Sequence, residues 1–256
     1  MLPTQIEQAF SLSGRVALIT GGGSGIGRAI AECFHAAGAH VIIASRNRDN
    51  LKTVAGIYQE RFDYEQFDVS SSNTAEGLIQ KVIQKHQRLD CIVHCAGIHL
   101  KAPALETSPE ELTSVLQTHL IGAHALSIAA AAPLRKHQGN LLFIASMASY
   151  IGLPNVCAYA SAKSAILGYV RSLASEWSPH GIRVNAIAPG WIETPMLQRA
   201  LEADPDRKER ILQRTPLKRL GAASEIGWAA LYLCSPAASF ITGTTLTVDG
   251  GASIGF

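Results

Sequence analysis

The stretch VALITGGGSGIG, residues 16–27, sets the architecture of the chain. Its first five residues are an apolar run typical of a buried strand, and a glycine-rich turn follows at once. An alanine-rich helix is predicted directly after the turn, over residues 28–37. Strand, glycine turn and helix in this order point backbone amides and a helix N-terminus at one place, where a phosphate binds. The stretch therefore predicts a dinucleotide site, although a glycine run by itself is also typical of a flexible loop.

Strands and helices alternate along the rest of the chain. Further strands are expected at residues 40–44, 65–67, 90–94, 141–144, 183–188 and 244–248. Further helices are expected at residues 49–61, 73–87, 109–131 and 158–176. This alternation is typical of a parallel sheet covered by helices, and no repeat or linker divides the sequence. We expect one doubly wound α/β domain over residues 1–256.

The residues after the second and third strands indicate which dinucleotide binds. Ser45 stands where an acidic residue would accept hydrogen bonds from the ribose hydroxyls, and Arg46 and Asn47 follow it. A missing carboxylate removes repulsion against a ribose phosphate, and the Arg46 guanidinium can pair with that phosphate. The pattern favours NADP(H) over NAD(H); a merely solvated Arg46 is the alternative. Asp68 and Val69 are placed to meet the adenine, although Asp68 also suits a cap of the next helix.

Ser146, Tyr159 and Lys163 are the candidate catalytic residues. Ser146 follows the strand at 141–144, and Tyr159 and Lys163 lie four residues apart, hence on one face of the helix at 158–176. A free phenol has a pKa of about 10, so Tyr159 needs a nearby cation to serve as an acid or base, and Lys163 is one. The Ser146 hydroxyl can hold a carbonyl or alcohol oxygen. Packing and solubility are the alternative explanation for the Tyr159 and Lys163 spacing.

Composition excludes several classes of protein. The net charge of the 256 residues is +2 without a basic or acidic block, so we expect neither a nucleic acid nor an anionic membrane surface as partner. No apolar run reaches the about 18 residues of a membrane span, and no secretory signal is visible. The five cysteines include no Cys-x-x-Cys pair and are interpreted as reduced thiols of a cytoplasmic protein. No Cys/His cluster has metal-ligand spacing, so no metal is expected.

Motifs from Gly14 to Gly251 together resemble the short-chain dehydrogenase/reductase family. They are Thr20-Gly21-x-x-x-Gly25-x-Gly27, Asp68-Val69, Ala96-Gly97, Ser146, Tyr159-x-x-x-Lys163, Asn185, Pro189-Gly190 with Thr194, and Asp249-Gly250-Gly251. The resemblance implies a seven-stranded doubly wound (Rossmann) parallel sheet, a nicotinamide cofactor along its carboxyl edge, and a homotetramer.

The resemblance also implies roles for individual residues. Ser146 would position the substrate oxygen, Tyr159 would donate or remove its proton, and Lys163 would bind the nicotinamide ribose and depress the pKa of Tyr159. The turn from Pro189 to Thr194 would hold the carboxamide. The residues implied to contact the cofactor are Gly21, Ser24, Gly25, Ile26, Gly27, Ser45, Arg46, Asn47, Asp68, Val69, Cys95, Ala96, Gly97, Tyr159, Lys163, Pro189, Gly190, Ile192 and Thr194.

Two departures from the family pattern matter. The family's usual Asn-Asn-Ala-Gly is here His94-Cys95-Ala96-Gly97, which loses a side-chain amide that commonly ties the central strands together, although Cys95 can still pack. His119 stands where the family's catalytic asparagine kinks a helix and holds a water linked to Lys163. A neutral histidine can donate one bond and accept one, so His119 is a candidate to anchor that water, and a histidine can titrate near neutrality. A packed histidine without a catalytic role is the alternative.

Residues 191–220 interrupt the alternation and suggest a substrate lid; an ordered surface excursion is the alternative. Basic residues in or near this segment are candidates to attract an acidic carrier or an anionic substrate: Arg199, Arg207, Lys208, Arg210, Arg214, Lys218 and Arg219. Acidic residues are interleaved with them, which favours a solvated charged helix instead: Glu202, Asp204, Asp206 and Glu209.

The function hypothesis is an NADP-dependent enzyme that interconverts a ketone and a secondary alcohol, with Tyr159 as proton donor or acceptor. By resemblance, 3-oxoacyl-carrier-protein reductases and sugar or sugar-acid dehydrogenases are the most similar members. The alternative is a cofactor-binding sensor or structural subunit with little turnover, suggested by Cys95 and His119. The presence of Ser146, Tyr159 and Lys163 argues against that alternative.

Overall fold

A seven-stranded sheet runs through the centre of the molecule, in the strand order β3-β2-β1-β4-β5-β6-β7. The computed structural model describes residues 3–58, 60–202 and 206–255. The strands are β1 Val16–Thr20, β2 His40–Ser45, β3 Phe62–Gln66, β4 Cys91–His94, β5 Asn140–Ile144, β6 Arg183–Pro189 and β7 Thr245–Val248. All neighbouring strands are parallel, so their carboxyl ends lie along one edge. The predicted doubly wound α/β fold is confirmed.

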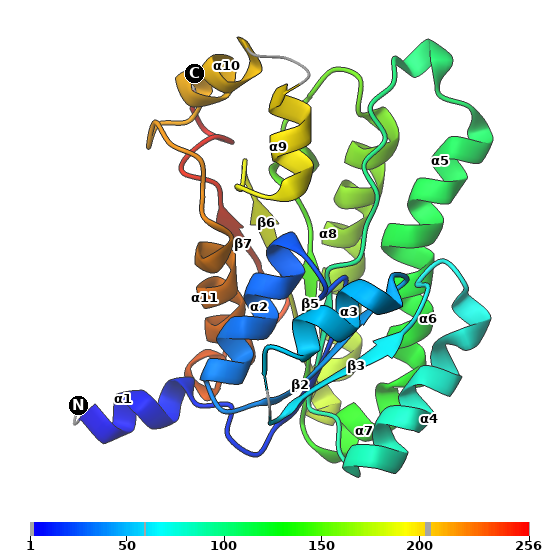
Figure 1. Ribbon diagram of the computed structural model, residues 1–256, viewed down its shortest axis with the longest axis vertical. Helices are drawn as coiled ribbons and strands as arrows, with labels where there is room; N and C mark the ends of the chain where they lie inside the picture. The colour runs from blue at the N-terminus through cyan, green and yellow to red at the C-terminus, as the bar shows by residue number, and fades with distance from the viewer. Residues whose placement is uncertain (1–2, 59, 203–205, 256) are drawn as a thin grey trace.

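Helices cover both faces of the sheet (Figure 1). One layer contains α2 Gly25–Ala36, α3 Arg48–Ala55 and α11 Ala223–Cys234. The other contains α4 Ala75–His86, α6 Gly122–Ala129 and α8 Cys157–Trp177. Successive residues of a strand pack against opposite layers. In β1, Ile19 packs with the α2 layer and Leu18 with the α8 layer. Burial on both faces explains why central strands such as β1 and β5 are nearly continuous apolar runs.

The remaining helices lie outside these layers or extend them. They are α1 Pro3–Phe10, α5 Pro109–Leu116, α7 Ala131–Lys136, α9 Pro195–Glu202 and α10 Asp206–Arg214. Figure 1 shows α9 and α10 at the top of the molecule and α1 at the opposite end. In the described part of the chain, none of the helices combines the length and the apolar character that crossing a membrane requires.

Several helix boundaries differ from those predicted. The helix expected over 109–131 is divided into α5 and α6 by a π-helical turn, Gln117–Ile121. Gly122 follows that turn, and a side chain there would collide with the Val69 carbonyl, so the helix can pass this close to the sheet edge only with glycine. The helix expected over 49–61 ends at Ala55, before Gly56. The helix α2 begins earlier than expected, at Gly25 inside the glycine motif, and α1 and α11 were not predicted.

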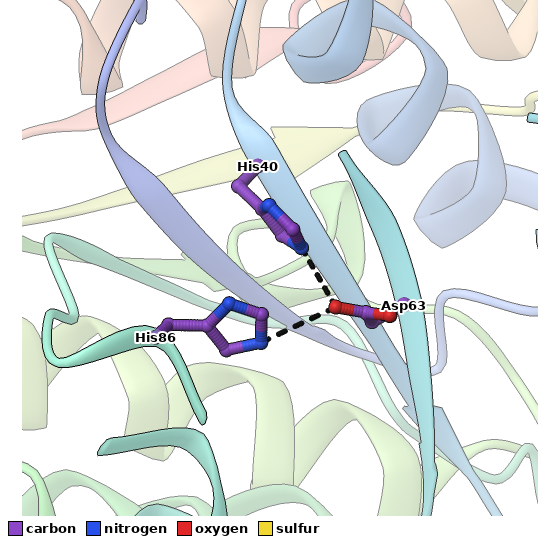
Figure 2. Close-up of side chains that lie close together, drawn as sticks. All are labelled: His40, Asp63 and His86. Carbon is purple, nitrogen blue, oxygen red and sulfur yellow. Dashed lines mark hydrogen bonds and ion pairs between the residues drawn. The ribbon is translucent and has the colours of Figure 1, made fainter. Parts of the chain in front are cut away.

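A cluster of polar side chains lies at the amino end of the sheet (Figure 2). Asp63 on the edge strand β3 lies with its Oδ2 atom 2.7 Å from His40 Nε2 and 3.3 Å from His86 Nε2. Lys85 donates to the other carboxylate oxygen at 2.7 Å. The cluster joins β2, β3 and the end of α4, and leaves the carboxyl edge free of these groups.

Candidate active site

The glycine turn joins β1 to α2 at the carboxyl edge of the sheet. Gly21 has a φ of +71°, and a side chain there would lie 2.9 Å from the Ala96 backbone, so only glycine allows β1 and β4 to end this close together. Thr20 Oγ1 accepts hydrogen bonds from the Cys95 and Ala96 amides, each at 3.2 Å. Ser24 precedes α2 without capping it through its side chain. The first amides of α2 are therefore available to an anion.

A cavity of about 260 Å³ opens beside this turn, between the carboxyl ends of β1, β2, β3 and β4. We call it the glycine-turn cavity. The sequence-predicted cofactor residues that line it are Gly21, Ser24, Ser45, Arg46, Asn47, Asp68, Val69, Ala96 and Gly97. Arg46 is exposed at its rim. A glycine cradle and a guanidinium at one cavity fit a dinucleotide that carries an extra phosphate.

Asp68 and Asn47 have local partners in this cavity wall. Asp68 Oδ1 accepts from the Ser70 amide at 3.0 Å and the Ser70 hydroxyl at 2.7 Å, and these bonds lower the pKa of the carboxyl. Asp68 therefore does not cap α4, whose N-cap is Thr74. Asn47 Oδ1 caps α3 by accepting from the Asn50 amide at 3.0 Å.

Ser146, Tyr159 and Lys163 meet where β5 ends against α8. Ser146 is buried, and its Oγ accepts from the Ala148 amide at 3.1 Å. Lys163 Nζ is buried, donates to the Ile144 carbonyl at 2.5 Å and lies 5.6 Å from the centroid of the Tyr159 ring. The three residues predicted to act together are thus neighbours in space.

Burial shifts the pKa values of this group in opposite directions. Loss of solvent raises the pKa of Tyr159 above its ordinary value, and the Ser146 hydroxyl partly offsets the rise. Loss of solvent lowers the pKa of Lys163 to about 8, so the ammonium is still mostly protonated at pH 7. The depression of the Tyr159 pKa expected from Lys163 is not present in the chain alone. A further positive charge is needed to produce it.

His119 lies behind Tyr159, in the π-helical turn. Its Nε2 atom is 2.8 Å from the Ile98 carbonyl oxygen and 3.2 Å from the Ile98 amide, and one ring nitrogen can satisfy only one of the two. Its Nδ1 atom is buried without a hydrogen-bond partner, and its ring meets Tyr159 edge-on at 5.6 Å. Burial, followed by the charge of Lys163, lowers the His119 pKa to about 3. The expectation that His119 titrates near neutrality is wrong, because the ring is desolvated.

Neighbouring residues compensate for the side-chain amide that the family has, and this chain lacks, around Cys95. His94 Nε2 and Ser127 Oγ are hydrogen-bonded at 2.9 Å, which links β4 to α6, and the His94 ring stacks on Phe143 at 4.4 Å. The Cys95 thiol packs against the α2 layer, and burial raises its pKa to about 11. A buried neutral thiol at this position fills space in place of the side-chain amide.

A second cavity, of about 600 Å³, lies over Tyr159. We call it the Tyr159 cavity. The predicted site residues that line it are Ser146, Tyr159, Ile26, Gly190, Ile192 and Thr194. Thr194 lies 3.4 Å from where a side chain on Gly25 would be, so the turn after β6 rests against the glycine turn. The glycine turn contributes Ser24 to one cavity and Ile26 to the other, which makes it their shared wall.

Some predicted site residues line neither cavity in the described part of the chain: Gly25, Gly27, Cys95, His119, Lys163 and Pro189. Gly27 instead packs against Gly21, with no room for a side chain. Sequence reasoning missed Lys101 and Asn155, which do line the Tyr159 cavity. Both lie in loops, where no periodic pattern marks a residue as facing a site.

The fold assembles one group of possible metal ligands that sequence spacing did not predict. The ligand atoms of His40, Asp63 and His86 lie within 4.8 Å of one another at the amino end of the sheet. The Asp63 carboxylate is already compensated there by the Lys85 ammonium at 2.7 Å. Because this cluster is at the opposite end of the strands, it takes no part in the candidate active site.

Comparison with known proteins shows similarity over nearly the whole chain. The family model described as Enoyl-(Acyl carrier protein) reductase matches residues 21–253. An L-fucose dehydrogenase of Rattus norvegicus is 36% identical over 250 residues, covering 95% of this chain and 91% of that protein. A chloroplastic tropinone reductase homolog of Arabidopsis thaliana is 35% identical, covering 97% of this chain and 78% of that protein.

Solved structures agree with the sequence comparison. A gluconate 5-dehydrogenase from Burkholderia cenocepacia, in complex with NADP and tartrate, superposes with a TM-score of 0.93 at 32% identity. The match covers 98% of this chain and 100% of that one.

Arg46 provides a test of cofactor choice. Arg46→Ala should weaken NADPH binding by about 10- to 100-fold, since a charge-assisted hydrogen bond contributes about 1.5–3 kcal/mol, and should change NADH binding much less. Fluorescence titration of both nucleotides measures this. Lys52→Ala, which removes an exposed charge of α3 that does not line the cavity, is the control. Equal losses for NADPH and NADH would remove Arg46 from the phosphate site.

The pH dependence of the protein's stability tests whether burial lowers the pKa of His119. Because its folded-state pKa is about 3 and the unfolded value is about 6.5, the unfolded state takes up the proton first as the pH falls. His119 therefore costs stability below about pH 6.5, by about 2 kcal/mol between pH 7 and pH 5. Denaturant unfolding of His119→Asn should show a smaller loss over that interval. An identical loss in both proteins would show that His119 is protonated in the folded state.

Proposed function

This chain belongs to the short-chain dehydrogenase/reductase family, and we propose that it is an NADP(H)-dependent oxidoreductase that interconverts a ketone and a secondary alcohol. The observation that carries the proposal is that Ser146 and Tyr159 open into one cavity while Lys163 lies directly behind the tyrosine ring. A carbonyl-reducing site requires two things from the protein: a group that hydrogen-bonds to the substrate oxygen, and a group that donates a proton to that oxygen.

The residues of the glycine-turn cavity support NADP(H) as the cofactor. The α2 N-terminus and the Gly21 turn would bind the pyrophosphate, Arg46 would pair with the ribose phosphate, and Asp68 would face the adenine. The turn from Pro189 to Thr194 would hold the carboxamide. When bound, NADPH supplies the hydride, and NADP⁺ accepts it in the reverse direction.

Tyr159 and Ser146 handle the substrate oxygen in this proposal. The Ser146 hydroxyl donates a hydrogen bond to the carbonyl oxygen and holds it beside the Tyr159 hydroxyl. Tyr159 then gives its proton to that oxygen as negative charge develops on it. Lys163 stabilises the phenolate that remains, because a protonated ammonium lies behind the ring. In oxidation the same proton moves in the opposite direction.

His119 is a positioning residue in this scheme. Its ring fixes the Ile98 backbone through Nε2 and holds the edge of Tyr159 in place. Its partnerless Nδ1 atom is the only group of the ring left to bind a water near the site.

The wider organisation of the molecule is also proposed from the family. We infer one domain over residues 1–256, a lid at about 191–220 formed by α9, α10 and their flanking turns, a homotetramer, and a cytoplasmic location. The position of Ile192 and Thr194 in the Tyr159 cavity supports the lid, since that segment forms one wall. The five free cysteines support a reducing compartment.

Replacing Tyr159 tests the proposed function. Tyr159→Phe removes the transferable proton with little change in volume, so it should lower kcat for ketone reduction by about 10²- to 10⁴-fold and leave NADPH affinity within a few-fold. Tyr169→Phe is the matched control, since Tyr169 lies on the same helix and bonds His124 instead.

Steady-state turnover of a ketone panel with NADPH gives the decisive readout. Retained activity in Tyr159→Phe would exclude Tyr159 as the proton carrier. Tight NADPH binding with no turnover of any ketone by the unchanged protein would instead support a cofactor-binding sensor.

A further inference from the structure

The helix α10 turns one charged face toward the Tyr159 cavity. Along the sequence its acidic and basic residues are interleaved, but the helical period of 3.6 brings three of the arginines to one side of the helix. Arg207, Arg210 and Arg214 lie three and four residues apart and line the cavity together with Ile211. Asp206 and Glu209 do not line it. A solvated charged helix stays a prediction for α10, whose Arg210 is exposed, while its cavity-lining side carries arginines.

Other basic residues of the lid segment are engaged elsewhere. Arg219 pairs with Glu225 at 2.7 Å, and Lys218 donates to the Gln213 carbonyl at 2.9 Å. Of the remaining basic candidates, Lys208 is exposed and does not line the cavity, and the Arg199 side chain lies outside what the structure describes. The acidic side chain of Glu202 and residue 204 also lie outside it. Within α10, Arg214 Nε also donates to the Ala252 carbonyl, at 3.4 Å, whereas Arg207 lines the cavity.

The loop after β4 adds positive charge to the same cavity. His99 and Lys101 line the same cavity, and the His99 ring lies 4.9 Å from the Tyr159 ring. Besides desolvation, the charges of Arg207 and Lys101 lower the pKa of His99, so both cations act on the space beside the tyrosine. Neither Lys101 nor Arg207 has a carboxylate partner in the described part of the chain.

The described lining of the cavity contains no carboxylate to compensate these cations. Among the described residues that line it, none is Asp or Glu. Cations gathered around a partly desolvated cavity repel one another, and a bound anion relieves that repulsion. An arginine fork is also suited to a planar carboxylate or a phosphate, which it can bind through two parallel hydrogen bonds.

We propose that the substrate is an anion, a small oxo acid or hydroxy acid whose carboxylate or phosphate is bound by Arg207 and Lys101 while its carbonyl or alcohol lies at Ser146 and Tyr159. The inference rests on the proposed function for the reacting end of the substrate. The inference adds the two residues, Arg207 and Lys101, that bind the charged end of the substrate and so orient it. The volume of about 600 Å³ would be shared by the nicotinamide end of the cofactor and a small acid of this kind.

Matched substrates that differ in charge test the proposal. NADPH-dependent reduction is measured for 4-oxopentanoate against its methyl ester, and for dihydroxyacetone phosphate against dihydroxyacetone. We expect kcat/KM to be at least 10-fold higher for an anion than for its neutral counterpart, and the two pairs distinguish carboxylate from phosphate. Ratios near one or below it in both pairs, with turnover present, would overturn the anionic substrate and leave the proposed function standing.

Variants then test whether Arg207 and Lys101 cause the preference for the anionic substrate. In Arg207→Ala and Lys101→Ala the anion-to-neutral ratio of kcat/KM should fall at least 5-fold, mainly through KM. Lys208→Ala removes the same charge from an exposed position of α10 that does not line the cavity, and should leave the ratio unchanged. An unchanged ratio in both cavity variants would overturn the assignment, and unaltered NADPH affinity shows that each variant is folded.

A binding measurement covers the case in which none of the four ketones is turned over. Calorimetric titration of D-gluconate and of neutral D-glucitol into the protein saturated with NADP⁺ should show at least 10-fold tighter binding of the anion, lost in Arg207→Ala. Anion binding without turnover contradicts the proposed function alone. Equal binding of both compounds contradicts the anion site itself.

Discussion

The buried ammonium of Lys163 is the constraint on which the site depends. Taking an ammonium out of water costs several kcal/mol unless its protons find acceptors, and here the Ile144 carbonyl accepts one at 2.5 Å. That bond requires the end of β5 and the first turns of α8 to keep one separation. Because Ser146 follows β5 and Tyr159 precedes Lys163 by one helical turn, the same bond places all three residues.

The chain by itself holds this site in a resting state. Burial keeps the phenol of Tyr159 neutral and brings the pKa of Lys163 down to about 8, and the nearby His119 stays neutral with a pKa of about 3. Lys163 therefore supplies one positive charge, directly behind the Tyr159 ring. In our account a bound oxidised nicotinamide adds the second positive charge, and only then does the phenolate become accessible near neutral pH.

The sequence predicted the architecture well because its signals are local and periodic. The apolar runs of β1 and β5 and the glycine turn sufficed, and the Tyr159 and Lys163 spacing placed both residues correctly on α8. What depends on tertiary packing was not predictable: the π-helical turn beside the sheet edge and the desolvation that removes His119 from the physiological pH range. Which charged residues of α10 line the cavity could be told only from the folded structure.

A titration of the tyrosines by phenolate absorbance, with and without saturating NADP⁺, tests the central claim most directly. With NADP⁺ bound, one tyrosine should ionise well below pH 10, and this transition should be missing in Tyr159→Phe. Without NADP⁺ the transition that is lost in Tyr159→Phe should be absent from that range, since burial holds the Tyr159 pKa above its ordinary value. Superimposable curves in the two conditions would contradict the account, because the cofactor would then leave the Tyr159 pKa unchanged.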